Sequence, residues 1–526
     1  MANLRILQRC CKLAELQRQR SMSILTITIF FPFLASLLLF SFSRESTKLT
    51  KIYATLVTFL TLGLGVWLGL NFQAKGGFEF EHTALEQWLG SSADIKYSVG
   101  LDGLSLVLFV FTTLMFAFVA LASWSVEQSV REYFFFLLML ETCILGIFAA
   151  TDLFLYYIFW EAMLIPMYFL IGIWGGTQRT AAATKFVLYM LTASLIMLVG
   201  IIYIGYLGRE VNGGIFTTDY QKLLTLRLPL DIEQVLFWLF GISFFVKSPL
   251  FPLHTWAADV YSESPVGAVL TGLLLKMAPY ALIRFNLMLF PEAAFSYAPL
   301  IGTLAVITIL YGALVAAAQR EMKRLLAFSS VSHLGFVMLG IFAFTEEALQ
   351  GAILQMISSA LSTGLLFLIV SRLESQYGSK DMYDYGGLKQ SMPLAAAAFL
   401  VAMLASVGLP GLSGFVGEFL VLNGAFKSAS LGTGLYAVLA AIGVILAVAY
   451  MLPMTQRIFF GPRREALAKL QDLDLREAAI ATLMVMAMLW IGLAPNTVLN
   501  VSASSSRATL EHVKVLPKQV QNTVNF

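Results

Sequence analysis

Helix-length apolar stretches recur from one end of this 526-residue chain to the other. A helix crosses the ~30 Å hydrocarbon core of a bilayer with about 20 predominantly apolar residues, so such a series is typical of a polytopic membrane protein. The composition agrees, because 59% of the residues are hydrophobic and 12% are charged, against about 25% charged in soluble domains. We therefore predict an all-α protein with about fourteen transmembrane helices. They lie at residues 23–42, 52–72, 104–123, 133–149, 153–174, 184–207, 235–260, 265–289, 298–318, 322–343, 348–371, 393–422, 434–456 and 478–494.

Several classes of function are excluded. The net charge of +3 gives no sign of nucleic-acid binding. The three cysteines, Cys10, Cys11 and Cys143, do not have the spacing of a zinc or iron–sulfur site. The chain contains no P-loop, and no G-x-G-x-x-G follows a strand. We therefore expect no nucleotide, flavin or cluster on this chain.

The distribution of lysine and arginine predicts the orientation. The loops after odd-numbered helices carry most of these residues, among them Arg131, Lys323 and Arg464, whereas the opposite loops carry few. By the positive-inside rule the first set of loops is cytoplasmic, and with fourteen spans both termini lie on the non-cytoplasmic side.

The first 21 residues form a basic extension that this orientation would place outside, whereas residues 22–526 are predicted to form a single antiporter-like transmembrane domain. An upstream start codon that lengthens the natural protein would explain the extension, since Met22 directly precedes the first span. An amphipathic arm on the membrane surface or on a partner is the alternative. A signal peptide does not fit, because no small-residue cleavage site follows the apolar run.

Two of the predicted spans are interrupted. The seventh contains Pro249 and Pro252, and the twelfth contains Gly408, Pro410 and Gly411. Proline removes a backbone donor, so the freed groups need partners inside the protein. The two breaks lie five helices apart, which predicts two five-helix repeats, helices 4–8 and 9–13, of inverted topology. Paired broken helices are typical of transporters; two incidental kinks are the alternative.

Few ionisable residues fall within the predicted spans, and such residues are costly in a bilayer and usually functional. They are Glu141, Glu161, Lys247, His254, Lys276, His333 and Glu418. Carboxylates, lysines and histidine at similar depth suit a proton relay. Burial raises the pKa of a carboxylate and lowers that of a lysine, and pairing of the two groups opposes both shifts.

All of these residues except His254 also have a structural explanation. Glu161 and Lys247 would otherwise form a static ion pair, Lys276 would extend to an interface, and His333 would be a satisfied core histidine. Glu418 would cap the free amides of the broken helix. For Glu141 the structural and the functional interpretations are equally open.

Seven segments in the same order resemble the antiporter-like membrane subunit M of bacterial respiratory complex I, whose organellar counterpart is chain 4. They are "GLDGLSL", "DLFLYYIFWEAMLIPMYFLIGIWGG", "VKSPLFPLHTW", "LLLKMAPYALIRF", "QREMKRLLAFSSVSHLGF", "GLPGLSGFVGEF" and "RIFFGP" with "LQDLDLRE" after it. The resemblance implies proton translocation driven by quinone reduction in other subunits, which would carry the iron–sulfur clusters and the quinone, with no cofactor on this chain. It also implies, as partners, the other membrane-arm subunits and the lipid bilayer.

The resemblance further implies the role of each matching residue. Glu161 and Lys247 would be the paired groups at proton uptake, Lys276 and His333 the central relay, and Glu418 the terminal acid. Such a chain would be a multi-pass protein of the bacterial inner membrane, or of the thylakoid membrane in a cyanobacterium.

Two positions depart from the family pattern. Tyr261 and Ser359 stand where the family usually has histidine, so the central water path is wired differently or the chain serves a specialised complex. The similar antiporter-like component of a multi-protein Na⁺/H⁺ antiporter is the alternative function. A stand-alone transporter of an organic solute is a weaker one, because no further polar site falls within the spans.

Overall fold

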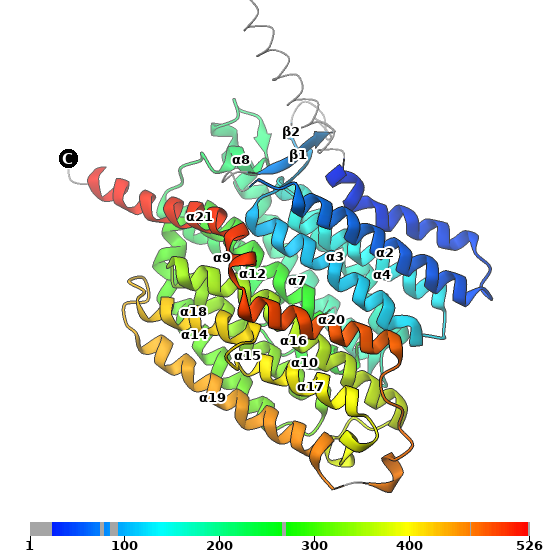
Figure 1. Cartoon of the computed structure of the whole chain (residues 1–526). Helices are drawn as coiled ribbons and strands as arrows, with labels where there is room; N and C mark the ends of the chain where they lie inside the picture. Colours follow the sequence, from blue (N-terminus) through cyan, green and yellow to red (C-terminus); the bar gives the residue numbers. More distant parts are fainter. Residues whose placement is uncertain (1–23, 74–77, 85–92, 266–269, 463, 524–526) are drawn as a thin grey trace, which may run out of the picture. The chain divides into compact units, whose positions relative to one another are not determined.

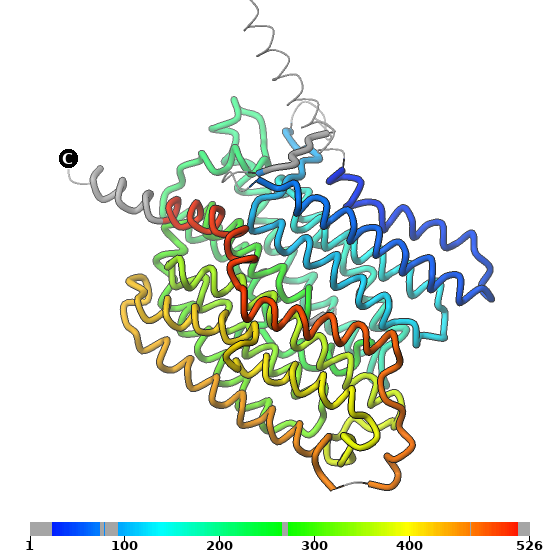
Figure 2. Tube along the Cα trace, viewed as in Figure 1, coloured from blue at the N-terminus to red at the C-terminus, as the bar shows by residue number. Residues whose placement is uncertain are grey.

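The computed structural model describes residues 24–73, 78–84, 93–265, 270–462 and 464–523 (Figure 2). The basic extension over residues 1–21 lies outside this part of the chain. The fold is largely helical, as predicted. Within the described residues, twelve helices are long and apolar enough to cross a membrane. The two predicted spans missing from that set are the interrupted ones, and the structure divides each of them into two shorter helices.

The chain forms two compact units. The first contains residues 1–117, 129–166 and 198–227, and the second contains residues 118–128, 167–197 and 228–526. The prediction of one transmembrane domain over residues 22–526 and that of two inverted repeats both stay predictions.

The first unit holds the N-terminal spans. They are the helix Ile24–Ser41, which ends in the 3₁₀ turn η1 (Leu39–Ser41), α2 (Thr47–Leu70), most of α3 (Gly103–Ala122), α4 (Val130–Ala149), α5 (Leu153–Ala162) and the end of α7 (Arg179–Leu207). Helix α4 packs against α2 and α5. The approach to α5 is close, because a Cβ atom at Gly146 would lie 2.4 Å from the ring of Phe159. Small residues let membrane helices approach in this way.

Short strands occupy segments that lie between the predicted spans. Strand β1 (Glu79–Ala84) pairs antiparallel with β3 (Tyr97–Leu101), and β2 (Ala93–Asp94) pairs parallel with β4 (Phe216–Thr217). The 3₁₀ turn η3 (Gly208–Glu210) precedes β4, and the short helix α8 (Tyr220–Leu223) follows it. Asp219 caps α8 by accepting hydrogen bonds from the amides of Gln221 and Lys222.

A cluster of charges joins these strands. Lys96 Nζ lies 3.0 Å from Asp219 and 3.4 Å from Asp94, and Lys222 Nζ lies 2.7 Å from Asp94. Partial burial works to raise the pKa of Asp94, but hydrogen bonds from Lys222 and Thr217 and the charges of both lysines outweigh it and hold the pKa below its usual value. The cluster therefore favours the ionised carboxylate.

The second unit holds the C-terminal spans, which Figure 1 shows from green to red. Its long helices are α9 (Leu230–Lys247), α14 (Pro291–Ala317), α15 (Met322–Phe342), α16 (Glu346–Tyr377), α17 (Pro393–Ser406), α18 (Ser413–Phe426), α19 (Leu435–Thr455), α20 (Leu475–Leu493) and α21 (Asn496–Thr523). The unit also contains most of α6 (Leu164–Trp174) and the start of α7. Shorter elements are η2 (Ser123–Ser125), α10 (Ala257–Glu263), α12 (Leu275–Ala281), α13 (Leu287–Leu289), η6 (Met382–Asp384), η7 (Leu388–Gln390), η8 (Gln456–Phe460) and η9 (Glu465–Leu467).

Helices α15 and α16 form the centre of this unit. Helix α15 packs against α14 and α16, and α16 packs against α17, α18 and α20. The most apolar window of each is 94% buried. The contact between α16 and α18 depends on glycine, because a Cβ atom at Gly351 would lie 2.7 Å from the amide nitrogen of Val421. Residues on these helices therefore face protein rather than lipid.

The eighth predicted span departs from a regular helix. Its described part contains two π-turns, η4 (Leu270–Leu274) and η5 (Leu282–Asn286), on either side of α12. Pro279 lies within α12, where it removes a backbone donor. π-turns of this kind are frequent at functional sites.

Candidate functional site

The seventh predicted span breaks directly after a buried lysine. Helix α9 ends at Lys247, whose side chain is 1% exposed, and α10 begins at Ala257. Across the break, the indole nitrogen of Trp256 donates to the carbonyl oxygen of Val246 at 2.9 Å. The amide of Phe251 donates to Thr308 Oγ1 at 3.0 Å. The structure thus supplies partners for backbone groups that the prolines free, as the sequence led us to expect.

His254 lies in the same break among aromatic rings. Its ring centroid is 4.9 Å from that of Tyr311 and 5.7 Å from that of Phe251, with which it is stacked. The side chain is buried. The described contacts of His254 are thus mainly apolar.

Ion pairs hold the short helix α10. Asp259 lies 2.6 Å from Lys185 on α7 and 3.0 Å from Arg324 on α15. Glu263 lies 2.7 Å from Lys380. Burial works to lower the pKa of Lys380, but its hydrogen bond to Glu263 and the nearby carboxylates raise the pKa overall. Three different segments of the second unit therefore fix this half of the broken span.

The twelfth predicted span breaks between Ser406 and Ser413. The loop between its halves turns at Gly408 and Gly411, whose φ angles are +73° and +93°. Only glycine adopts such angles readily. A Cβ atom at Gly408 would lie 2.8 Å from Oε2 of Glu418, so the loop passes directly against the carboxylate of the second half.

A buried polar cluster gathers at this second break. His333 Nδ1 on α15 lies 3.3 Å from Glu418 Oε1 on α18, and His333 Nε2 lies 3.0 Å from Ser406 Oγ on α17. Gln355 Nε2 on α16 donates to the same Glu418 oxygen at 3.1 Å. All four residues are at most 4% exposed. The structure therefore brings together two of the predicted residues, His333 and Glu418.

Sequence reasoning missed Gln355 and Ser406. Neither residue is ionisable, and nothing in helical periodicity separates them from other polar residues of the spans. Tyr450 was also missed; its hydroxyl donates to Ser329 Oγ at 2.9 Å. The only available signal was the position of Ser406 at the end of a helix that glycine and proline interrupt.

Lys276 lies between the two π-turns on α12 and is 3% exposed. Helix α12 contacts α9, which carries Lys247, and α15, which carries His333. Helix α12 therefore contacts both of the helices that carry Lys247 and His333.

Glu141 and Glu161 belong to the first unit, on the packed helices α4 and α5. Glu141 is fully buried, and neither of its carboxylate oxygens has a hydrogen-bond partner among the described residues. Glu161 is half-buried, two residues before the irregularity at Met163. Because Lys247 belongs to the other unit, the pairing of Glu161 with Lys247 stays a prediction.

Asp152 is a further buried acid of the first unit. It caps α5 by accepting from the amides of Phe154 and Leu155, and Thr218 Oγ1 donates to it at 2.8 Å. Burial raises its pKa to about 6 against the opposing effect of these hydrogen bonds. Its position as a helix cap gives it a structural role.

The two departures from the family pattern are both buried. The hydroxyl of Ser359 donates to the carbonyl oxygen of Gln355 on its own helix at 2.7 Å. The ring of Tyr261 lies against Trp256 and Phe367. In the contacts that the structure describes, Tyr261 packs against aromatic rings and Ser359 bonds to the backbone of its own helix.

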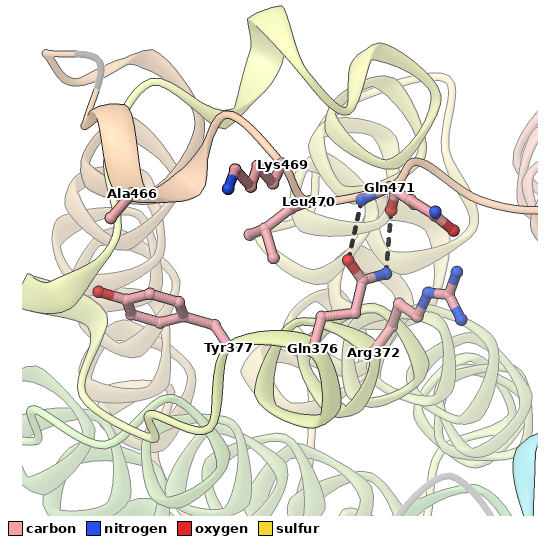
Figure 3. A pocket seen from close by; sticks show the side chains of 7 residues that line it. All are labelled: Arg372, Gln376, Tyr377, Ala466, Lys469, Leu470 and Gln471. Carbon is pink, nitrogen blue, oxygen red and sulfur yellow. Dashed lines mark hydrogen bonds between the residues drawn. The ribbon is translucent and has the colours of Figure 1, made fainter.

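The described residues contain no group of three or more His, Cys, Asp or Glu side chains that could hold a metal ion. A surface pocket of about 360 Å³ lies in the second unit (Figure 3). Gln376 closes one side of it by exchanging two hydrogen bonds with the backbone of Gln471, at 2.9 and 3.0 Å. Its lining consists of Arg372, Gln376, Tyr377, Ala466, Lys469, Leu470 and Gln471. None of the predicted site residues lines this pocket.

Two broken spans and a buried cluster of ionisable groups define an antiporter-like polytopic membrane subunit. Residues 150–445 match the family described as NADH:quinone oxidoreductase/Mrp antiporter, transmembrane. The chain belongs to this family, which confirms the resemblance seen in the sequence.

Individual relatives match over nearly the whole chain. Subunit M of the NADH-quinone oxidoreductase of Rickettsia typhi is 35% identical over 488 residues, which cover 91% of this chain and 97% of the relative. An NAD(P)H-quinone oxidoreductase chain 4 of Thermosynechococcus vestitus is 36% identical over 95% of this chain and 94% of its own length. A chain of respiratory complex I from Thermus thermophilus superimposes with a TM-score of 0.83 at 33% identity, covering 94% of this chain and 99% of that one.

Proposed function

We propose that this chain is a proton-translocating membrane-arm subunit of a complex I-type NAD(P)H or ferredoxin:quinone oxidoreductase. The observation that carries the proposal is the buried contact of His333 with Glu418 at a broken helix, in a chain whose relatives are named as subunits of quinone oxidoreductases. The chain is thus part of an enzyme, and the redox chemistry takes place on other subunits.

In the proposed relay, Glu161 and Lys247 form the switch at the start of the path. A closed glutamate–lysine pair stabilises both charges, and separation of the pair favours release of the lysine's proton. Lys276 and His333 pass the proton on, and Glu418 is the terminal acid. His254 lies on the same predicted span as Lys247, and Glu141 lies on α4, which packs against the helix that carries Glu161. We include both residues as further members of the relay.

The proposal extends to location and partners. Its partners are the other membrane-arm subunits and the surrounding lipid, and no nucleic acid is involved. The membrane is a bacterial inner membrane or a cyanobacterial thylakoid membrane. The excess of lysine and arginine in the loops after odd-numbered helices puts both termini on the non-cytoplasmic side. Partner subunits hold the iron–sulfur clusters and the quinone, and this chain holds no cofactor.

The family also includes Mrp antiporter components, so the antiporter-like component of a multi-protein Na⁺/H⁺ antiporter is the second candidate. Purification of the assembly through a tag on this chain distinguishes the two. We expect quinone-site and iron–sulfur subunits to co-purify, together with quinone reductase activity. Recovery of small antiporter subunits alone, without that activity, would show that the second candidate is correct.

A further inference from the structure

His333 connects the two halves of the broken span. One ring nitrogen contacts Ser406, the last residue of α17, and the other contacts Glu418 on α18. Gln355 approaches from a third helix and donates to the glutamate oxygen that faces the histidine. Nδ1 of His333 and Oε1 of Glu418 lie 3.3 Å apart without a hydrogen bond between them in this structure. Each member of the pair is held by a side chain that does not ionise.

We propose that Ser406 and Gln355 are positioning residues for proton transfer between His333 and Glu418, an inference that rests on the function proposed above. Ser406 accepts a hydrogen bond from Nε2–H, so that Nε2 keeps its proton and Nδ1 is the nitrogen that exchanges. Gln355 fixes Oε1 of Glu418 towards Nδ1. Each residue thus acts through one member of the pair.

The proton transfer is balanced without any further reactant. The Nδ1–H bond of the charged imidazole breaks and an O–H bond forms at Oε1, which leaves a neutral ring and a neutral carboxylic acid. Nε2 keeps its hydrogen and its contact with Ser406 throughout. A hydroxyl can accept in this way, and the bond made by one ring nitrogen decides the tautomer of the other.

Among the described residues, several neighbouring helices carry further titratable groups. Helix α10, which packs against α15, carries Asp259, Tyr261 and Glu263. Glu418 faces His333 from α18, and Tyr450 of α19 interacts electrostatically with Glu418. Lys276 lies on α12, which also contacts α15. Helices α16 and α17 contribute Gln355 and Ser406 to the cluster, and neither of these titrates.

Ser406 stabilises the charged ring of His333, whereas Gln355 stabilises the carboxylate of Glu418. Removal of each residue should therefore affect a different limb of the pH–rate profile of pumping. Ser406→Ala removes the acceptor that favours the charged ring, which moves the alkaline limb of the pH–rate profile to lower pH. Gln355→Met removes a donor that favours the carboxylate, which moves the acid limb to higher pH. Both variants thus narrow the profile, each from a different side.

The experiment measures proton pumping driven by quinone reduction, in vesicles that contain the whole complex, between about pH 6 and 9. We expect each variant to pump about three- to tenfold more slowly at the far end of its affected limb, the range set by one buried hydrogen bond. Ser406→Thr keeps the hydroxyl and restores the profile. Rates are compared per assembled complex, so that poor assembly does not imitate the effect.

The chain offers a matched control for each variant. Gln350 lies on the same helix as Gln355 and donates to the carboxylate of Glu346 at 3.2 Å, so Gln350→Met removes a similar contact elsewhere. Ser502 is fully buried and bonds to the carbonyl of Leu499 on its own helix, so Ser502→Ala removes a buried hydroxyl. Both controls should keep the wild-type profile.

Glu418→Gln separates the two proposals. If it abolishes pumping while Ser406→Ala and Gln355→Met retain the wild-type profile, the positioning roles are wrong and the relay stands. If Glu418→Gln pumps at the full rate, the relay itself is wrong. A narrowed profile in both positioning variants, with Glu418→Gln inactive, supports both proposals.

Discussion

Gly408 and Glu418 approach so closely that a Cβ atom on the glycine would lie 2.8 Å from the carboxylate oxygen Oε2. The glycine also has a φ angle of +73°. The loop that breaks the span is therefore shaped around the acidic side chain of the helix that follows it.

Replacement of Gly408 by alanine should impair both folding and function. The left-handed backbone costs an alanine about 1–2 kcal/mol, and the added methyl group displaces the carboxylate from its place near His333. We expect a lower unfolding temperature in detergent and a loss of proton pumping in vesicles.

Gly432→Ala is the control, because Gly432 has a φ of +72° and no atom within 4 Å of the added Cβ. It should lower the unfolding temperature and keep pumping; equal pumping in both variants would refute the argument.

Gly417→Ala should disturb the same site from the other side. A Cβ atom there would lie 2.6 Å from Oε1 of Gln355 and 3.0 Å from its backbone nitrogen. The backbone of α16 is central and cannot yield easily, so we expect about 1–3 kcal/mol of destabilisation and reduced pumping. Gly63→Ala, on α2, meets no atom within 4 Å and should be neutral or slightly stabilising. Thermal unfolding in detergent compares the two, and equal effects would contradict the clash.

Much of this architecture is accessible from the sequence, because span length, proline and glycine are local signals. The breaks after Lys247 and after Ser406 lie where proline and glycine predicted them. The buried ionisable residues were equally visible, since a charge in an apolar stretch needs an explanation. His333 and Glu418 lie far apart in the chain. The sequence could therefore suggest that both belong to one relay, but it could not predict that they are in contact.

Other features have no local signal. The π-turns around Lys276 depend on the hydrogen-bond register of one helix, which its residue pattern does not determine. The short strands near Asp94 form between segments that are far apart in the sequence. Gln355 and Ser406 are ordinary polar residues until the packing of α15, α16 and α17 brings them to His333. These features therefore depend on tertiary contacts, which the periodicity of the sequence does not reveal.

The charge cluster at Asp94 predicts a pH-dependent stability outside the membrane. The pKa of Asp94 is lowered in the folded protein, so its contribution is present above the unfolded value of about 3.8 and is lost as pH falls through the folded value. Because these pairs are partly exposed, we expect less than about 1 kcal/mol. Asp94→Asn should lower the unfolding temperature at pH 7, and this difference from the wild type should disappear as the pH falls through the lowered pKa of Asp94. Glu45→Gln, at an exposed site, should behave like the wild type; a deficit of Asp94→Asn that persists at acid pH would rule out the charge as its cause.

Lys247 and Glu161 provide the most direct test of the relay. If the pair starts the proton path, Lys247→Ala and Glu161→Ala should each reduce pumping by about tenfold or more, because a missing proton carrier cannot be replaced by its neighbours. We expect assembly to survive in both variants. Lys427→Ala is the control, because Lys427 is 55% exposed and its pairing with Glu347 lies at the surface. Pumping is measured in vesicles of the reconstituted complex, with subunit content checked on native gels. Full pumping by both alanine variants would remove Glu161 and Lys247 from the path, whereas loss of assembly would assign them a structural ion pair instead.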